Sequence, residues 1–250
     1  MGISIIIPTL NEAQSLQRTL SQLSVLDPSP QEVLVVDGAS KDNTVAIAQT
    51  AFQTFDPSVR TEIVLCQTRG RAVQMNRGAA LATGAVLCFL HADTSIPNDA
   101  IAAMETTLTD PDVTGGGFIS IMTGSQTTRW GISLHNYLKT YYAPLLFRPH
   151  LFVRGLRLLF GDQVLFCRHD DFINCGGFDE TMPIMEDGDL CLKLVRQGKL
   201  RLVNRIVESS DRRVARWGAL KATAIYLYVG LLWGFGVSTA YLKQFYEDIR

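Results

Sequence analysis

Short apolar runs alternate with polar turns and amphipathic segments through the first half of the chain. The runs are residues 3–7, 33–36, 62–66 and 85–90. Most are followed by a stretch in which apolar side chains recur three or four positions apart, as at Leu16, Leu20 and Leu23, which is typical of a helix. Because strands alternate with helices, the pattern predicts an α/β fold with a mostly parallel, doubly wound sheet and right-handed crossovers.

The second half is less regular. Residues 115–122 are typical of a strand entered through glycines, and residues 163–168 of a short strand. Residues 186–198 predict a helix with carboxylates in its first turn, where the helix dipole favours them. Residues 126–160 are rich in aromatic side chains and arginine and give no assignment.

Polar side chains follow each of the four predicted strands at its carboxyl end. They are Thr9, Asn11, Glu12, Asp37, Arg69, Arg71, His91 and Asp93. Ligands of doubly wound sheets bind beyond these strand ends. Loops are polar in general, but loop composition does not by itself select carboxylates that directly abut two of the most apolar strands. We therefore expect a binding site at this edge of the sheet.

Asp37 stands directly after a strand and before a glycine. Ser40 or Asp42 could cap the helix that begins near Asn43, but helix capping leaves Asp37 unexplained. A carboxylate in this position can accept hydrogen bonds from a base or a ribose. The sequence lacks both G-x-G-x-x-G after the first strand and G-x-x-x-x-G-K-[ST], which argues against an NAD site and excludes a P-loop.

His91 and Asp93 flank Ala92 at the end of the fourth strand, and alternate residues of an extended segment share a face. An imidazole and a carboxylate can hold a divalent cation whose other ligands are water and phosphate oxygens. The histidine favours Mn²⁺ slightly over Mg²⁺. The alternative is a structural pair in which the two side chains are hydrogen-bonded to each other.

Composition narrows the class of protein. The chain has 250 residues, a formal net charge of -1 and 19% charged residues, so neither an acidic tail nor a basic nucleic-acid surface is indicated. The five cysteines are odd in number and include no C-x-x-C pair, which favours reduced, buried thiols. The first residues lack the basic segment and longer apolar run of a signal peptide. We therefore expect a cytoplasmic protein.

Six stretches together resemble a known family. In chain order they are "SIIIPTLNEA", "LVVDGASKDNT", "GRAVQMNRGA", "FLHADT", "GGF" at 176–178 and "MEDGDLCLKL". Over nearly all of residues 3–200 the chain resembles the family 2 glycosyltransferases, which have the GT-A fold, a Rossmann-like, mostly parallel sheet with flanking helices. "GDQVLF" and "RRVARWG" are similar to a bacterial subgroup of small enzymes associated with radical-SAM or arsenosugar genes, or with carotenoid (diaponeurosporenoate) glucosylation.

The resemblance implies a nucleotide-sugar site. Thr9, Glu12 and Asp37 would hold the uracil and ribose of the donor, and Arg71 would reach the nucleotide. The segment 91–93 stands where most members have Asp-x-Asp, whose second carboxylate touches a metal that bridges the diphosphate. That role falls to Asp93, while histidine replaces the first aspartate of the motif and puts the identity of the metal in doubt.

The resemblance also implies a catalytic pair. Glu186 and Asp187 match the family's Glu-Asp pair, in which the aspartate deprotonates the acceptor. An alcohol needs such a base because it is a poor nucleophile until its proton is taken. The remaining donor or acceptor candidates are Asp162, which has a turn role as its alternative, Phe178, Asp179, Arg212 and Arg213. The two arginines would hold phosphate oxygens or, alternatively, face lipid headgroups or water.

The C-terminal tail contains an uncharged stretch at residues 222–242, about the length of a membrane span. The basic residues between positions 212 and 221 would keep the catalytic side cytosolic if it crossed a membrane. Glycines and hydroxyl-bearing side chains within the stretch weaken that interpretation. An interfacial helix that docks on the membrane, a core or dimer helix, and a true span all remain open.

These observations predict three parts of one chain. Residues 1–110 form the nucleotide-sugar-binding half, residues 111–210 the acceptor-binding and catalytic half of the same domain, and residues 211–250 a helical tail. The predicted function is an inverting transfer of a hexose from a UDP-sugar to a hydroxyl or carboxyl of a small or lipid-like acceptor, with Mn²⁺ or Mg²⁺ as cofactor. We expect a cytoplasmic enzyme, in contact with the membrane face or as a homodimer, with no nucleic-acid partner.

Two other functions remain as alternatives. A nucleotidyltransferase that forms sugar nucleotides also uses a nucleotide-binding α/β sheet, but it needs a glycine-rich loop near its first strand, where this chain has "IPTLNEA". A non-catalytic protein that binds nucleotide-sugars or serves as a membrane scaffold would not need Asp93 and Asp187.

Overall fold

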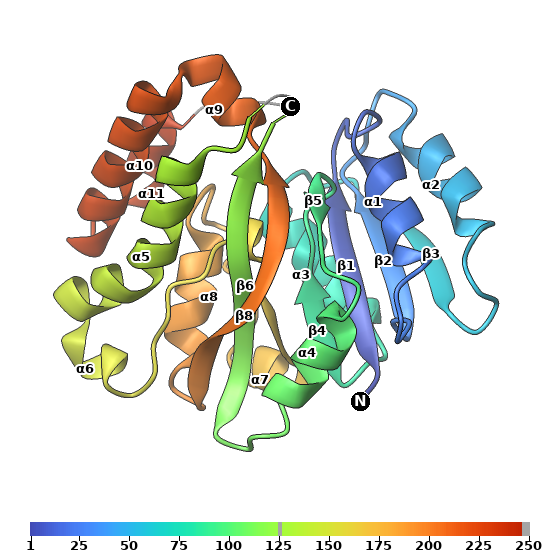
Figure 1. Ribbon diagram of the computed structural model, residues 1–250, viewed down its shortest axis with the longest axis horizontal. Helices are drawn as coiled ribbons and strands as arrows, with labels where there is room; N and C mark the ends of the chain where they lie inside the picture. Colours follow the sequence, from blue (N-terminus) through green and yellow to red (C-terminus); the bar gives the residue numbers. More distant parts are fainter. Residues whose placement is uncertain (125–126, 247–250) are drawn as a thin grey trace.

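One eight-stranded sheet runs through the whole molecule, with helices on both of its faces (Figure 1). The computed structural model describes residues 1–124 and 127–246. The strands are β1 (Ile3–Thr9), β2 (Glu32–Asp37), β3 (Arg60–Leu65), β4 (Val86–Phe89), β5 (Thr94–Ser95), β6 (Val113–Thr123), β7 (Phe166–Arg168) and β8 (Lys199–Ser210). The helices are α1 (Leu16–Leu23), α2 (Thr44–Phe52), α3 (Arg71–Leu81), α4 (Ala100–Thr107), α5 (Trp130–Phe147), α6 (Pro149–Phe152), α7 (His169–Asn174), α8 (Glu186–Leu194), α9 (Arg212–Trp217), α10 (Ala219–Gly234) and α11 (Thr239–Leu242), with short 3-10 turns at η1 (Gly161–Gln163) and η2 (Lys243–Phe245).

The sheet has the strand order β3-β2-β1-β4-β7-β6-β8-β5. The first four strands in this order are parallel, which confirms the doubly wound pattern of the first half. β7 then pairs antiparallel with both β4 and β6, and β8 lies parallel to β6. The sheet is therefore mixed at its second end, and β7 joins the parallel strands of the first half to β6, which the sequence also predicted.

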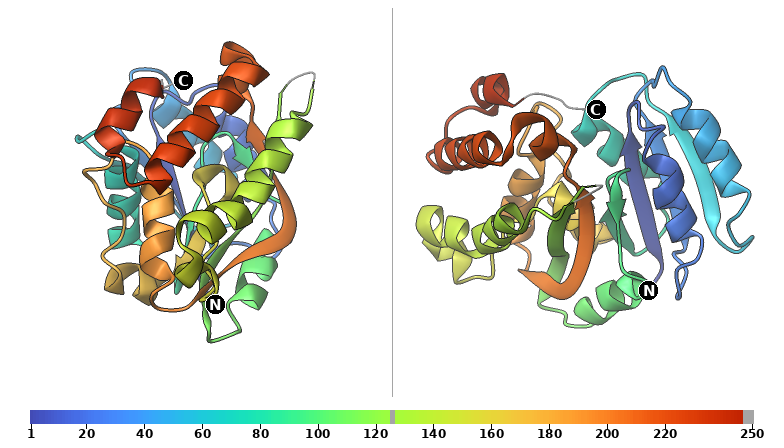
Figure 2. Two further views of the ribbon diagram at one scale, coloured as in Figure 1. Left: turned by 90° about the vertical axis from the view of Figure 1, so that its left-hand side faces the viewer. Right: turned by 45° about the horizontal axis from the view of Figure 1, so that its top comes forward.

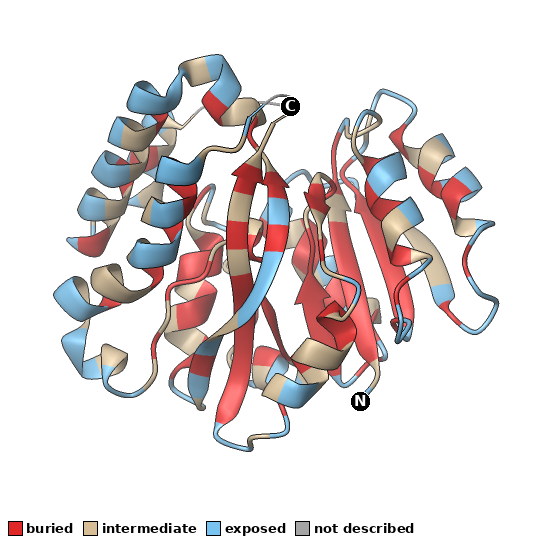
Figure 3. Ribbon diagram, viewed as in Figure 1, coloured by how far each residue is buried: buried red, intermediate tan, exposed pale blue. Residues whose placement is uncertain are grey.

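The side chains of β1 alternate between two hydrophobic cores. Ile5 and Ile7 pack on the face covered by α1, α2 and α4. Ile6 points to the other face, where α3 and α8 lie. Successive side chains of a strand point to opposite faces, so a strand buried on both sides is apolar at every position. Figure 3 shows this central part of the sheet buried along its length, with exposed positions on the outer sides of the helices.

The two predicted halves share these cores. Val207 of β8 packs in the same core as Ile5, and Leu200 packs in the same core as Ile6. β5, which follows β4 closely in the sequence, crosses to the far edge of the sheet and pairs with β8. The division at residue 110 stays a prediction, and the sheet and both cores continue across it.

Three segments differ from the sequence-based expectation. Residues 163–168, expected as a strand, contain the end of η1 and only a three-residue strand, β7. Residues 126–160 contain the long helix α5, whose periodicity is masked because apolar side chains such as Leu134 and Leu138 lie on its exposed side as well. β8 was not predicted, since many of its side chains are exposed and polar.

The tail forms a helical hairpin. α10 ends at Gly234, the chain turns through Gly236 at a positive φ of 86°, and α11 begins at Thr239. Figure 2 shows α10 beside α5 and α11. Within the described residues, no helix has both the length and the apolar character needed to cross a bilayer. The uncharged stretch at residues 222–242 is therefore divided between two helices.

Candidate functional site

The carboxyl ends of β1 and β2 lie side by side, with Thr9 paired in register with Asp37. The Thr9 hydroxyl donates to Asp37 Oδ1 at 3.1 Å, and the Ser40 backbone N–H donates to Asp37 Oδ2 at 2.8 Å. Gln74 of α3 donates its amide to the backbone carbonyls of Thr9 and Val36, both at 2.7 Å. Gln74 was not among the predicted residues because a glutamine within a helical pattern gives no signal in the sequence.

Arg212 joins two of the predicted carboxylates. Its Nη2 lies 2.7 Å from Asp93 Oδ2 and 3.0 Å from Glu12 Oε2. Arg212 is the first residue of α9, whereas Asp93 follows β4 and Glu12 follows β1. Arg212, late in the sequence, therefore completes the polar edge of the sheet that the first half of the chain forms. The Asp93 carboxylate is therefore paired with a cationic side chain in this structure.

Arg71 connects the nucleotide-side edge to α8. Its Nε donates to Glu186 Oε1 at 2.5 Å, and its Nη2 lies 4.0 Å from Asp187 Oδ2. Glu186 is 2% exposed, and its second oxygen has no hydrogen-bond partner among the described residues. Glu186 is thus held by Arg71 through Oε1, while the buried Oε2 makes no hydrogen bond with the described residues.

Asp187 lies beside Glu186 in the first turn of α8. Its Oδ2 accepts a hydrogen bond from the Gly161 N–H at 3.0 Å. Burial, and then the neighbouring Glu186, raise the pKa of Asp187 to about 7, although Arg71 and the Gly161 N–H act in the opposite direction. A carboxyl group with this pKa can accept a proton near neutral pH.

His91 completes the cluster. Its Nε2 lies 3.4 Å from Arg71 Nη1. Burial, and then the charge of Arg71, lower the pKa of His91 to about 4, so the ring is neutral at pH 7. A side chain at position 161 would overlap His91 Nε2 and lie 3.3 Å from Asp187 Oδ2. Only glycine at position 161 lets its N–H approach Asp187 beside the imidazole.

The remaining predicted residues are dispersed. Asp162 accepts a hydrogen bond from Asn136 Nδ2 at 2.9 Å, next to the cluster. Asp179 accepts a hydrogen bond from the Thr181 N–H at 2.9 Å within its own turn. Phe178, predicted to line an acceptor pocket, is 2% exposed and packs in the core.

Arg213 points away from Arg212 to the end of the chain. Its guanidinium lies 4.3 Å from the centre of the Tyr246 ring and donates a hydrogen bond to the Tyr246 hydroxyl. Tyr246 also interacts electrostatically with Arg71 and Glu186. Tyr246 was not predicted, because only the tertiary fold brings this residue near Arg71 and Glu186.

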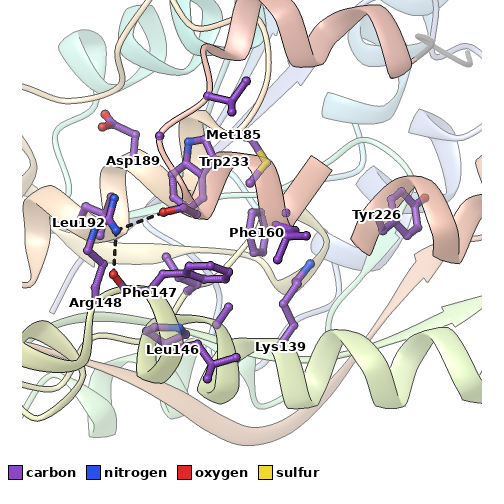
Figure 4. Close-up of a pocket in the computed structure, with 18 of the residues that line it drawn as sticks. Lys139, Leu146, Phe147, Arg148, Phe160, Met185, Asp189, Leu192, Tyr226 and Trp233 are labelled. Atoms are coloured by element: carbon purple, nitrogen blue, oxygen red, sulfur yellow. Dashed lines mark hydrogen bonds between the residues drawn. The ribbon is translucent and has the colours of Figure 1, made fainter. Parts of the chain in front are cut away.

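A cavity of about 410 Å³ lies between α5, α8 and α10. Its walls are mostly apolar, and Figure 4 shows Phe147, Phe160 and Trp233 among the side chains around it. Phe160 and Met185 line the cavity, and each directly precedes a residue of the cluster, Gly161 and Glu186. Residues that line the cavity thus adjoin the buried carboxylates in the chain, although Glu186 and Asp187 do not themselves line it.

His91 and Asp93 have the chemistry of an open metal site. The lowered pKa of His91 leaves the imidazole neutral, as a metal ligand must be, and Asp93 already accommodates a guanidinium. No group of three or more histidine, cysteine, aspartate or glutamate side chains in the described part of the chain forms a metal cage. The two residues fit a divalent cation whose other ligands come from a substrate and water.

Known proteins share features with this chain. A family model described as "Glycosyl transferase family 2" matches residues 4–173. A curated "Pre-mycofactocin glycosyltransferase" of Mycobacterium tuberculosis is 27% identical over 232 residues, which cover 88% of this chain and 45% of that protein. The chain spans about half the length of the curated relatives that it matches.

Solved structures have the same fold. A mannosyltransferase of Pyrobaculum calidifontis in complex with GDP-Man and Mn²⁺ gives a TM-score of 0.71 at 20% identity, over 93% of this chain and 62% of that one. Glucosyl-3-phosphoglycerate synthase of Mycobacterium tuberculosis, with Mn²⁺, uridine-diphosphate and glucosyl-3-phosphoglycerate, gives 0.63 at 17% identity, over 94% of this chain and 80% of that one. These likenesses confirm the predicted fold class.

Proposed function

Because this chain belongs to glycosyl transferase family 2, we propose that it is an inverting glycosyltransferase that moves a hexose from a nucleotide-sugar to a lipid-like acceptor. The observation that carries the proposal is the position of Asp187. This buried carboxyl group, with a pKa of about 7, lies 4.0 Å from Arg71 Nη2 and stands in the chain between Met185 and Asp189, which line an apolar cavity. A base in this place can serve an acceptor that enters from the cavity while the donor occupies the strand edge.

The donor lies along the carboxyl ends of the strands. Thr9, Glu12 and Asp37 hold the base and ribose, and UDP is the proposed nucleotide because these positions match the family's uracil-binding residues. The two solved structures above contain GDP-Man in one case and UDP in the other, so both nucleotides belong in the test. Arg71 and Arg212 face the diphosphate and compensate part of its charge.

Asp187 takes the proton of the acceptor hydroxyl as its oxygen attacks the anomeric carbon from the side opposite the diphosphate. The bond from the anomeric carbon to the diphosphate oxygen breaks, and its electron pair stays on the diphosphate. The attack from the opposite side inverts the configuration at this carbon. Glu186 holds Arg71 in place and so supports the developing negative charge.

A divalent cation, Mn²⁺ or Mg²⁺, supplies charge neutralisation at the diphosphate when it is bound. His91 and Asp93 would hold this cation. Arg212, which pairs with Asp93 in this structure, would supply a second positive charge near the phosphate oxygens.

The activity is tested by incubating the protein with UDP-glucose or GDP-mannose, with Mn²⁺ or with EDTA, and a long-chain alcohol or acid as acceptor. We expect release of one nucleoside diphosphate and a product heavier by one hexose, both dependent on Mn²⁺. Nucleotide binding without a hexosylated product from any donor and acceptor pair would leave only the non-catalytic alternative.

The pH dependence gives a separate prediction. Asp187 must be ionised to accept a proton, so the turnover number should rise as the pH increases through about 7 and level off above it. Turnover measured at saturating substrates between about pH 5 and pH 9 checks this. A rate that falls across the same range would mean that an acid, and not a base, limits the reaction.

The outer side of α5 and α10 supports a membrane contact. Most of the large apolar side chains that are exposed in the described residues lie on these helices and the segments after α10, including Trp130, Leu220 and Phe235. Lys221 and Arg216 lie beside them, which suits an anionic lipid surface. Because the same helices enclose the cavity, a lipid-like acceptor can enter the cavity from the bilayer.

Replacing Leu220 and Phe235 together by serine should weaken binding to vesicles of equal parts phosphatidylglycerol and phosphatidylcholine by roughly 10²-fold. The two side chains are 90% and 73% exposed, so the fold loses little. Co-sedimentation with vesicles measures the effect. Val25→Ser is the matched control, because Val25 is 69% exposed after α1, away from this surface.

A homodimer that uses the same surface is the competing outcome. It predicts a doubled mass by light scattering in the absence of lipid, and conversion to a monomer by the double substitution. A monomer that does not bind vesicles would contradict the membrane contact.

A further inference from the structure

Asp187 by itself does not distinguish an acceptor alcohol from water. Both lose a proton to the same carboxylate as their oxygen attacks the anomeric carbon, so the site also hydrolyses a nucleotide-sugar wherever water reaches the base. Asp187 is 4% exposed and Glu186 is 2% exposed, but the side chain of Arg71 beside them is 40% exposed. The base is therefore buried directly next to a side chain that solvent reaches.

Tyr246 lies close to these charged groups. Its ring and Met185, which directly precedes Glu186 in the chain, pack against the same hydrophobic cluster. Its hydroxyl interacts electrostatically with Arg71 and Glu186. The centre of its ring lies 6.4 Å from that of Tyr226, which lines the apolar cavity. Tyr246 therefore adjoins both the charged cluster and the wall of the cavity from which an acceptor is proposed to enter.

Two side chains of α9 hold Tyr246 in this place. The guanidinium of Arg213 lies 4.3 Å from the centre of the Tyr246 ring and donates a hydrogen bond to its hydroxyl. The ring of Trp217 meets the Tyr246 ring edge-on, with 6.0 Å between the two centres. Within the described residues, the ion pairs of α9 belong to Arg212. Arg213 thus contacts aromatic rings and a hydroxyl rather than a carboxylate, which gives its charge to the contact with Tyr246.

The chemical character of Tyr246 suits a group that excludes water. Burial raises the pKa of its phenol, although Arg213 and Arg71 act in the opposite direction, so the side chain is neutral at about pH 8. A neutral ring displaces water without bringing a negative charge close to the proposed diphosphate. Its hydroxyl already accepts the hydrogen bond from Arg213. These properties describe a cover for the reaction centre and not a second base.

We propose that Tyr246, anchored by Arg213, is a positioning residue that closes the reaction centre against water. It transfers no proton, and it keeps the acceptor, instead of water, as the nucleophile that Asp187 serves. The inference goes beyond the proposed function but rests on it, because it assumes a nucleotide-sugar in the site. Without the ring, a water oxygen attacks the anomeric carbon, its proton passes to Asp187, the bond to the diphosphate oxygen breaks, and free hexose and nucleoside diphosphate leave.

Hydrolysis is compared with transfer in the full-length protein, with Mn²⁺, UDP-glucose or GDP-mannose as donor, and 1-decanol as acceptor. Released nucleoside diphosphate measures both reactions together, and hexosylated decanol measures transfer alone. The wild-type protein should release little nucleotide beyond the product that it forms. Tyr246→Ala should raise the ratio of hydrolysis to transfer about tenfold, because the missing ring leaves room for water. Tyr246→Phe keeps the ring over Arg213 and should stay within about threefold of the wild-type ratio.

Arg213→Met should raise the ratio in the same direction, because the anchor is lost while the side chain keeps a similar length. It gives the same comparison if Tyr246→Ala does not fold. Combined with Tyr246→Ala, it should add no further increase, since the two residues act as a unit. Tyr137→Ala is the matched control and should leave the ratio unchanged. Tyr137 is a 37% exposed tyrosine of α5 that packs against Tyr141, and neither of these two lines the cavity.

A purely structural role for Tyr246 gives a different result. Loss of folded protein lowers hydrolysis and transfer by the same factor, so a lower rate with an unchanged ratio in Tyr246→Ala or in Arg213→Met would overturn the proposal. An equal rise of the ratio in Tyr137→Ala would overturn it as well. A rise in Tyr246→Phe as large as in Tyr246→Ala would assign the effect to the hydroxyl and contradict a role of the ring.

Failure of the proposed function has its own signature. If neither the wild-type protein nor any variant released nucleotide from either donor, the glycosyltransferase proposal itself would be contradicted, and the inference with it. Transfer to decanol with the same ratio in the wild-type protein and in Tyr246→Ala would contradict the inference alone.

Discussion

Asp187→Asn should lower the turnover number by roughly 10²–10⁴-fold while donor affinity persists. Asparagine keeps the shape of the side chain and can still accept the Gly161 N–H, but it cannot take a proton. The donor contacts proposed for Thr9 and Asp37 lie at the far edge of the site and are unchanged. Steady-state kinetics, together with calorimetry of the nucleotide, separate the two effects.

Glu186→Gln should cost less than Asp187→Asn. Glu186 accepts from Arg71, and an amide oxygen can keep that hydrogen bond while losing the charge attraction. Asp170→Asn is the matched control, because Asp170 stands in the first turn of α7 as Asp187 stands in that of α8, but is exposed and remote from the cluster. If Glu186→Gln were inactive and Asp187→Asn nearly normal, the roles would be reversed.

Asp93→Ala should reduce Mn²⁺-dependent donor binding by roughly 10²-fold or more without unfolding the protein. The side chain is 21% exposed after β4, and it forms an ion pair with Arg212, so the substitution removes a polar contact and not hydrophobic packing. The substitution removes the only carboxylate of the two residues, His91 and Asp93, that are proposed to hold the cation. Calorimetry of UDP with Mn²⁺ and with EDTA measures the loss, and thermal melting checks the fold.

The control for this change is Asp99→Ala, which removes a surface carboxylate that pairs with Arg205. It should leave nucleotide binding unchanged. Unchanged affinity for UDP with Mn²⁺ in Asp93→Ala would show that the cation is not held at this position. A greater loss in EDTA than in Mn²⁺ would assign Asp93 to direct nucleotide contact through Arg212.

The first half of the fold could be predicted because its signals are local. The strands β1, β2 and β4 are mostly apolar, and the polar residues that follow them mark the edge of the proposed site. α5 and β8 escaped prediction because each carries a mixture of apolar and polar side chains on exposed positions, which removes the periodicity. α5 packs against α10 on one side and borders the cavity on another, so no continuous polar face marks it as a helix in the sequence.

The candidate residues divide in the same way. Asp93, Asp187 and Arg71 stand in motifs and were found, but their partners were not all foreseen. The contact of Gly161 with Asp187 depends on a backbone N–H, which no side-chain pattern reports. Tyr246 comes from a segment without a motif, and only the tertiary fold brings it near the cluster.

The charged contacts of the cluster join distant parts of the chain. Arg71 and Glu186 are 115 positions apart, and Glu12 and Arg212 are 200 positions apart. During synthesis the nucleotide-side strands can therefore leave the ribosome long before α8 and α9 are available to complete the cluster. A chain that ends before residue 186 lacks both carboxylates of α8 and Arg212, so the proposed catalytic cluster is complete only after all of these segments have been made.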